Sequence, residues 1–242
     1  MTAVAATDET ASVLSYSHKT HSYSGIGAVK VRSILKDTYG SKLNLTGCAV
    51  WTAGEVFCRY ICDNPLLFRG KSCLELGAGT GLTGIVLSKV QDDALAVLVL
   101  TDGEPEVLAL LQSNCADNGM PAAVQLSLLL WGVNSGSQLL LSERPEGFDC
   151  IYGCDLFYNR SQEDKVALAF DTVAALLTKD PSGRFYLSFT RRDLDINAVL
   201  AIALAKGFNA RVIDECTWDI FSTNTDGLTD LWRDAVFEFR RV

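Results

Sequence analysis

The stretch Cys73-Leu-Glu-Leu-Gly-Ala-Gly-Thr-Gly-Leu-Thr-Gly84 decides the fold of this chain. Within it, residues 74–76 are typical of the end of a buried strand, and the following residues 82–90 are typical of a helix. Between them a glycine stands at every second position from Gly77 to Gly81. Glycines at such a turn let the backbone pass close to a ligand, and the free N–H groups at the start of the helix can donate to it. The stretch therefore predicts a nucleotide-type cofactor site.

A carboxylate stands where such a cofactor needs one. Asp102 comes 25 residues after Gly77, directly after the apolar run 94–100. An acid at the end of the second strand usually holds the hydroxyl groups of a ribose. The glycine spacing here is G-x-G-x-G, whereas dinucleotide enzymes favour G-x-G-x-x-G, so a nicotinamide dehydrogenase is a weaker alternative. Glu75 precedes the glycines, and an acid there suits a cationic ligand better than a pyrophosphate.

The composition fits one large α/β domain. The chain has 242 residues, 48% of them hydrophobic, with a formal net charge of −8. Nonspecific binding of nucleic acid needs a basic face, so we expect no nucleic-acid partner. The eight cysteines contain no C-x-x-C pair, which argues against a zinc site and suits a reducing compartment, taken to be the cytoplasm. Apolar runs such as 94–100 are far shorter than the ~20 residues of a membrane span, and we expect neither a signal peptide nor a membrane partner.

The N-terminus differs in composition from the rest. Residues 1–24 are rich in Ser, Thr and Ala, and we expect a mobile tail. Both histidines of the chain, His18 and His21, fall within it; we expect them to be solvated, which leaves no histidine as a general base. Residues 25–242 should form a single domain, in which 25–70 are an extension with one strand and one helix. The core is ample and no heptad seam demands a partner, so we expect a monomer.

Strand and helix patterns alternate along the domain. Strands are predicted over 29–35, 72–76, 94–100, 124–130, 148–154, 184–189, 209–213 and 235–241, and helices over 53–62, 82–90, 104–114, 162–177 and 195–206. This order predicts a Rossmann-like, doubly wound and mostly parallel α/β sheet. Ligands of such sheets lie outside the carboxyl ends of the strands. Gly77, Asp102, Trp131 and Asp155 all follow strand ends, so we expect them in one crevice.

Several motifs together resemble the class I, seven-strand methyltransferases that use S-adenosylmethionine (SAM), and more narrowly the family 16 protein-lysine methyltransferases. The motifs are Thr46-Gly-Cys-Ala-Val-Trp51, Glu75-Leu-Gly-Ala-Gly-Thr-Gly81, Thr101-Asp102-Gly103, Trp131-Gly132 and Gly153-Cys-Asp-Leu-Phe-Tyr158, the last matching the D-x-x-Y motif of the family. The resemblance covers roughly residues 45–240. Members methylate lysines of abundant cytosolic proteins such as elongation factors, chaperones and calmodulin, so it implies a protein substrate.

The resemblance also implies roles for individual residues. Trp51 would shield the methionine end of SAM, Asp102 would hold its ribose, and Trp131 would lie against its adenine. The remaining cofactor contacts would come from Glu75, Gly77, Ala78, Gly79, Gly103 and Cys154. Leu129 and Leu130 stand where the family commonly has an acid, so a polar adenine contact from those side chains is lost.

Asp155 and Tyr158 are the predicted acceptor residues. A carboxylate and an aromatic face suit a lysine ammonium through ion pairing and cation–π contact. They lie three residues apart, and both reach the same side if the chain turns helically there. Asp155 as a helix cap and Tyr158 as a core aromatic are the plain alternatives. Two other functions stay open, a catalytically idle SAM-binding module that works through a partner and a nucleic-acid amino-methyltransferase.

Overall fold

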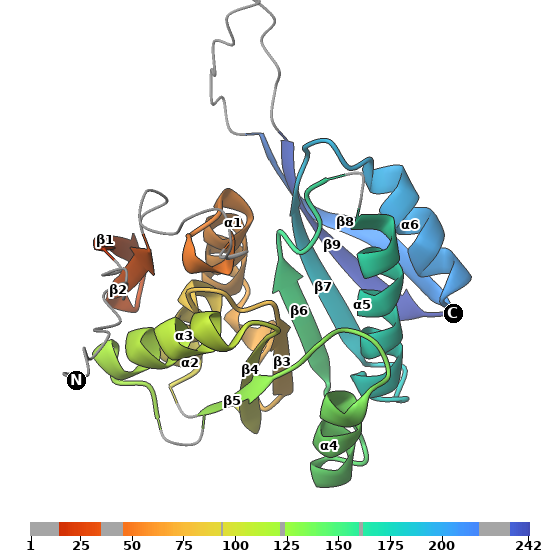
Figure 1. The fold of residues 1–242 in the computed structure, drawn as a ribbon, viewed down its shortest axis with the longest axis horizontal. Coiled ribbons are helices and arrows are strands. Elements are labelled where there is room, and N and C mark those ends of the chain that lie inside the picture. The colour runs from red at the N-terminus through yellow and green to blue at the C-terminus, as the bar shows by residue number, and fades with distance from the viewer. Residues whose placement is uncertain (1–14, 35–45, 93, 122–123, 160–161, 218–232) are drawn as a thin grey trace, which may run out of the picture.

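The computed structural model describes residues 15–34, 46–92, 94–121, 124–159, 162–217 and 233–242, in which strands and helices largely alternate (Figure 1). The strands are β1 (Tyr16–Tyr23), β2 (Gly27–Ile34), β3 (Ser72–Leu76), β4 (Val97–Asp102), β5 (Val124–Leu128), β6 (Cys150–Cys154), β7 (Arg184–Thr190), β8 (Phe208–Thr217) and β9 (Arg233–Arg241). The helices are α1 (Thr52–Asp63), α2 (Leu82–Gln91), α3 (Pro105–Asp117), α4 (Ser135–Glu143), α5 (Glu163–Leu176) and α6 (Ile196–Ala205), with short 3-10 turns η2 (Thr46–Cys48) and η3 (Pro65–Leu67). Among these helices none is both long and apolar enough to cross a membrane.

Seven of the strands form one sheet, in the order β5-β4-β3-β6-β7-β9-β8. The strands from β5 to β7 are parallel, and β9 runs antiparallel to both of its neighbours. Helices α1, α2 and α3 lie on one face, and α5 and α6 on the other, with α4 packed against α5 (Figure 1). The central strand β3 is buried at every residue, as expected of a parallel strand covered on both faces. The predicted doubly wound, seven-stranded sheet is confirmed.

An apolar core lies on each face of the sheet. On the α1 side, the Phe57 ring is fully buried, 5.4 Å from the ring of Tyr152 and 6.1 Å from that of Tyr186. On the α5 side, the Phe170 ring lies 5.6 Å from that of Phe185. Full burial of one such side chain contributes about 1.5–3 kcal/mol to folding. The helices pack against the sheet through these two cores, and this packing fixes the positions of the strand ends.

The N-terminal extension differs from the sequence-based expectation. Within the predicted tail, Tyr16–Tyr23 forms strand β1, which pairs antiparallel with β2 in a separate two-stranded sheet. His21 is only 6% exposed rather than solvated, and burial lowers its pKa below the ordinary value. His18 is exposed, as expected. The expectation of a tail over residues 1–14 falls outside the described residues.

Asn114 of α3 and Asn118, the residue that caps the C-terminus of α3, hold this hairpin. Asn114 and Asn118, four residues apart on one helix face, each accept a hydrogen bond from a β2 backbone N–H and donate one to the carbonyl of the same residue. Asn114 bonds Arg32 at 2.8 and 3.1 Å, and Asn118 bonds Lys30 at 3.0 and 2.6 Å. The side chains thereby satisfy backbone groups at the edge of β2, as a neighbouring strand would do.

Two smaller differences concern element boundaries. The strand predicted over residues 94–100 begins only at Val97: the Ala94 N–H donates to the Gln91 carbonyl in the turn after α2, and the Ala96 N–H donates to the Lys71 carbonyl just before β3. Helix α4 was not predicted. It starts with a capping box in which the Asn134 side chain accepts from the backbone N–H of Ser137 and the Ser137 hydroxyl accepts from that of Asn134.

Replacement by alanine is expected to change the stability of the protein in opposite directions at two helical glycines, Gly84 of α2 and Gly54 of α1. A Cβ at Gly84 of α2 would overlap the buried Leu100 side chain and lie 2.9 Å from Glu75 Oε2, whereas at Gly54 of α1 it would meet Thr83 Oγ1 at 3.6 Å, an ordinary contact. We expect Gly84→Ala to destabilise the protein by about 1–3 kcal/mol through overpacking. Gly54→Ala should stabilise it by about 0.5–1 kcal/mol through helix propensity. Urea unfolding of both variants measures the difference, and equal shifts would contradict this account.

Candidate functional site

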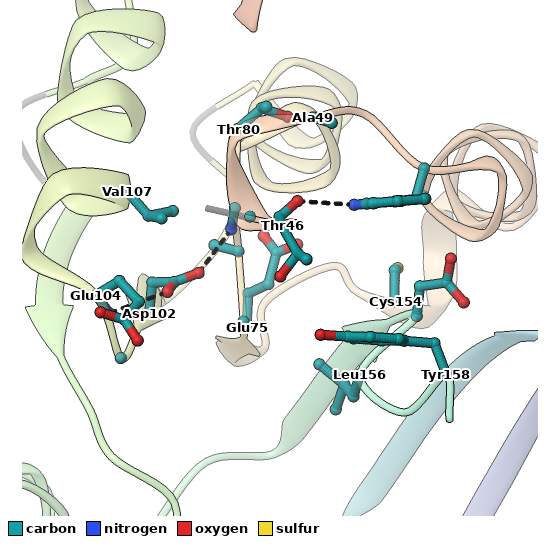
Figure 2. Close-up of a pocket in the computed structure, with 18 of the residues that line it drawn as sticks. Thr46, Ala49, Glu75, Thr80, Asp102, Glu104, Val107, Cys154, Leu156 and Tyr158 are labelled. Carbon is teal, nitrogen blue, oxygen red and sulfur yellow. Dashed lines mark hydrogen bonds between the residues drawn. The ribbon is translucent and has the colours of Figure 1, made fainter. Parts of the chain in front are cut away.

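A cavity of about 370 Å³ lies where the strands from β3 to β6 end. This volume is within the range of small-molecule sites. The residues that the sequence singled out all line it: Trp51, Glu75, Gly77, Ala78, Gly79, Asp102, Gly103, Trp131, Cys154, Asp155 and Tyr158. Figure 2 shows Asp102 and Glu104 toward one end, Cys154 and Tyr158 toward the other, and Glu75 between them. The fold therefore brings the predicted residues together, without assigning a role to any of them.

The glycine loop after β3 has no room for side chains. Gly79 has a φ of 56°, in the left-handed region, and a Cβ there would lie 2.8 Å from the carbonyl oxygen of Gly47. Only glycine meets both constraints, so the loop backbone packs directly on the segment before α1. Gly47 belongs to the turn η2, which carries the first motif of the family resemblance, and this explains why the two motifs occur together.

Asp102 at the end of β4 fixes the loop. Its Oδ2 accepts the Gly79 N–H at 3.0 Å (Figure 2), and its Oδ1 accepts the N–H of Glu104 at 3.2 Å. Burial raises the pKa of Asp102, and hydrogen bonds from Gly79, Glu104 and Gly103 act in the opposite direction. A carboxylate has about four acceptor positions, and these two bonds leave positions for a ligand hydroxyl.

Glu75 is the most deeply buried acid of the cavity wall. It is 2% exposed, and its Oε2 accepts the Tyr152 hydroxyl at 3.2 Å from the neighbouring strand β6. Burial raises the pKa of Glu75 from 4.5 to about 8. At neutral pH the carboxyl of the free protein is therefore largely protonated, and a cation placed beside it would favour its ionisation. This refines the expectation of a charged acid beside the loop.

Two tryptophans line the cavity from different sides. Trp51 precedes α1 and donates its indole N–H to the Thr46 carbonyl at 2.9 Å, which sets the orientation of the ring (Figure 2). Trp131 lies 5.8 Å from Phe157, edge to face. The backbone N–H that follows it, on Gly132, donates to Thr172 of α5 at 2.6 Å.

Asp155 adopts a backbone conformation rare for a residue with a side chain. Its φ is 56°, and its N–H donates to the Ser188 carbonyl on the neighbouring strand β7. The residue is 7% exposed, and its Oδ2 accepts from Arg192 Nη2 at 2.6 Å. Its Oδ1 is buried and has no hydrogen-bond partner in the described part of the chain. Burial raises the pKa of Asp155, while the Arg192 charge lowers it.

The segment after Asp155 is not helical. The expectation that Asp155 and Tyr158 reach the same side assumed a helical turn there, so that reason does not hold. The N–H of Tyr158 instead donates to Gln162 Oε1 at 2.9 Å, which bends the chain toward α5. Helix α5 starts at Glu163, so Asp155 is no helix cap. Both predicted acceptor residues nevertheless line the same cavity.

Arg192 is the functional candidate that sequence reasoning missed. It lies in the loop after β7, lines the cavity and places its guanidinium 5.0 Å from the Trp51 ring, in addition to the ion pair with Asp155. It belongs to the stretch Ser188-Phe-Thr-Arg-Arg-Asp193, which covers the end of β7 and the loop after it. The described residues hold no cluster of three or more His, Cys, Asp or Glu side chains that would bind a metal ion.

Comparison with known proteins places the chain among methyltransferases. A family model described as lysine methyltransferase matches residues 35–199. Protein N-lysine methyltransferase METTL21A of Danio rerio is 39% identical over 113 residues, covering 45% of this chain and 47% of that protein. EEF1A lysine methyltransferase 3 of Xenopus tropicalis is 32% identical over 121 residues, 50% of this chain and 49% of its own length. Histone-arginine methyltransferase METTL23 of Rattus norvegicus is 30% identical over 151 residues, 62% of each chain.

The match to the first two relatives spans about half of their length. Among solved structures, a putative methyltransferase, SMU.776, complexed with SAH, aligns with a TM-score of 0.62 at 14% identity, covering 91% of this chain and 56% of that one. At this identity the likeness supports the fold alone, which agrees with the sheet described above.

The buried Glu75 predicts a pH dependence of stability. Because its folded pKa, about 8, exceeds its ordinary 4.5, the folded protein holds a proton that the unfolded chain releases. Wild-type stability should therefore fall as pH rises from about 5 to 8, at up to ~1.4 kcal/mol per pH unit from this group. Glu75→Gln keeps the acceptor for Tyr152 and cannot titrate, so it should gain stability relative to wild type over this window. Urea unfolding at several pH values measures the gain, with the exposed Glu106→Gln as control; a constant difference would refute the assignment.

Proposed function

The chain belongs to the lysine methyltransferase family whose model it matches, and from this premise we propose that it transfers methyl groups from SAM to a lysine side chain of a protein. The observation that carries the proposal is one cavity with two unlike ends. One end has the glycine loop and Asp102, which suit a nucleoside, and the other has Asp155 and Tyr158, which suit an organic cation, with Trp51 nearby to shield the methionine end of SAM. A methyl transferase needs both ligands in contact.

The cavity fits SAM on three counts. Its volume of about 370 Å³ is suitable for a cofactor of this size. Gly79 leaves backbone free of side chains beside Asp102, whose remaining acceptor positions suit the ribose hydroxyls. The protonated Glu75 gains charge when a cation is near it. When bound, SAM supplies a methyl group on a positively charged sulfonium, and Trp131, Gly77, Ala78, Gly103 and Cys154 are assigned to the same ligand.

Asp155 has the task of capturing the acceptor. A lysine ammonium must become neutral before it can attack, which costs about 4.6 kcal/mol at pH 7 from its unperturbed pKa near ~10.4. A dry cavity and a cationic ligand lower that pKa, whereas a carboxylate raises it. We therefore assign Asp155 to holding and orienting the side chain and Tyr158 to packing against it, with the proton leaving to water. Alignment of the reacting groups is the main contribution of such a site to rate.

The substrate is proposed to be a cytosolic protein, such as an elongation factor, chaperone or calmodulin, met by a single copy of this chain in the cytoplasm. One relative is named for lysine methylation of EEF1A, and the net charge of −8 favours a basic protein surface over nucleic acid. An arginine acceptor is the second candidate. One relative is named a histone-arginine methyltransferase, and a guanidinium, that of Arg192, already fits between Asp155 and Trp51.

The ribose assignment predicts a graded loss of cofactor binding. Asp102→Asn keeps an acceptor for the Gly79 N–H but removes the charge, and Asp102→Ala removes both. We expect Asp102→Ala to weaken the binding of SAM and of its demethylated product by about 1.5–3 kcal/mol, the loss usual for a hydrogen bond to a charged group, and Asp102→Asn by less. Calorimetry measures this, with melting temperature as the folding control and NAD as a ligand that should not bind. Unchanged affinity in both variants would exclude Asp102 as the ribose contact.

The acceptor assignment predicts that Asp155→Asn retains SAM binding and loses transfer by at least ~10²-fold, because the acceptor is no longer positioned. Tyr158→Phe should lose less activity than Tyr158→Ala if the ring is what matters. The assay incubates a cell lysate with radiolabelled SAM and enzyme and resolves the labelled proteins, whose hydrolysates separate methyl-lysine from methylarginine. Normal transfer by Asp155→Asn together with a lowered melting temperature would make Asp155 structural. Absence of label with wild-type enzyme would favour the idle SAM-binding module.

A further inference from the structure

Arg192 is held by the kinds of group that an acceptor cation needs. Its guanidinium pairs with Asp155 at 2.6 Å and lies 5.0 Å from the Trp51 ring. The Asp155 side chain is 2% exposed and that of Arg192 is 23% exposed, so the cation reaches the carboxylate from the open side of the cavity. A carboxylate and an indole face together form a strong site for an organic cation. The protein's own arginine thus lies where the proposed acceptor must bind.

A second buried carboxyl lies close enough to the same guanidinium to be influenced by its charge. Asp234 of β9 pairs in register with Thr190, two residues before Arg192, and is 2% exposed. Its Oδ1 has no hydrogen-bond partner among the described residues, and the same is true of Asp155 Oδ1. Burial raises the pKa of Asp234, while the neighbouring Thr190 hydroxyl and, to a smaller extent, the charge of Arg192 lower it. Two buried carboxyls therefore lie near one guanidinium, which forms its ion pair with Asp155.

Buried polar atoms without partners are unfavourable, so this arrangement is incomplete. A second cation would complete it, because each carboxylate would then have its own partner. The reversed direction of β9 makes this possible, since it brings Asp234 from far along the chain to the end of β7.

We propose that Arg192 occupies the place of the acceptor cation in the free protein, and that an arriving lysine ammonium takes over Asp155 while the guanidinium moves to Asp234. The inference rests on the proposed function, since it assumes that an acceptor lysine binds at Asp155. Arg192 is then a positioning residue that reserves the acceptor site. An acceptor can bind only while Arg192 is away from Asp155, so the apparent affinity is the intrinsic affinity multiplied by the fraction of molecules in which the site is free. If that fraction is about a tenth, the acceptor binds about tenfold more weakly.

The movement of Arg192 from Asp155 to Asp234 is tested with n-butylammonium chloride, a probe that stands in for the lysine side chain. The titration is done at about pH 8, with sodium chloride of equal ionic strength as the control. NMR of protein carrying ¹³C-labelled arginine follows the Arg192 guanidinium, identified by its loss in Arg192→Lys. We expect the probe to shift the Arg192 signal in a saturable way. Arg192→Met should bind the probe about tenfold more tightly, and Arg192→Lys, which keeps an internal cation, should bind like wild type.

Asp234→Asn distinguishes movement of Arg192 to Asp234 from simple competition between Arg192 and the probe for Asp155. It keeps the shape but removes the charge that would receive Arg192, so probe binding should weaken by about tenfold, while SAM affinity, measured as a folding control, stays unchanged. Equal probe affinity in wild type, Arg192→Met and Asp234→Asn would overturn the proposal. So would an Arg192 signal that does not move while the probe shifts the Tyr158 ring. None of these readouts needs methyl transfer, so a wild-type protein that labels nothing in lysate refutes the proposed function independently.

Discussion

The hydrogen bond from the Gly79 N–H to Asp102 Oδ2 is the contact on which the site depends. It joins the loop after the central strand to the end of the next strand, and the same loop packs without side chains on the Gly47 carbonyl. Three separate segments of the sequence, those of Gly47, Gly79 and Asp102, thus meet at Gly79. A Cβ at Gly79 would clash with the Gly47 carbonyl, so this junction of the three segments requires glycine.

The cavity concentrates buried carboxyls. Glu75, Asp102 and Asp155 all line it, and burial is the first cause that raises the pKa of each. Each acid has a partner that partly offsets burial: a tyrosine hydroxyl, backbone N–H groups and a guanidinium, respectively. A cavity of this kind favours positively charged ligands, because a cation recovers the ionisation that desolvation suppresses. The same reasoning applies at both ends, for a sulfonium and for an ammonium.

The sequence predicted most of the sheet and the eleven residues that now line the cavity, because parallel strands bring their carboxyl ends to one edge whatever their order. It did not predict features that depend on which strands are neighbours. The protonation of Glu75 follows from its burial in a strand paired on both sides, and only the pairing of β3 with β6 brings the Tyr152 hydroxyl, which partly offsets that burial, near it. The sequence did not predict strand β1, because its hairpin is held by side chains at the C-terminal end of α3, far along the chain. Arg192 was missed because a loop arginine has no periodic pattern.

The two ends of the cavity differ in how their sequence is arranged, and this bears on how such proteins diverge. On the proposed assignment, the glycine loop and Asp102 of the cofactor end come from the short stretch between β3 and α3, and Trp131 and Cys154 also lie within the region that the family model matches. The acceptor end combines Trp51, Asp155 and Arg192 with Asp234, and Asp234 lies beyond the matched region 35–199. A change at the reversed strand β9 therefore alters the charge facing the acceptor without disturbing the loop that Asp102 holds. On the proposed assignment, a change in the C-terminal strands can therefore alter acceptor binding while the cofactor end stays as it is.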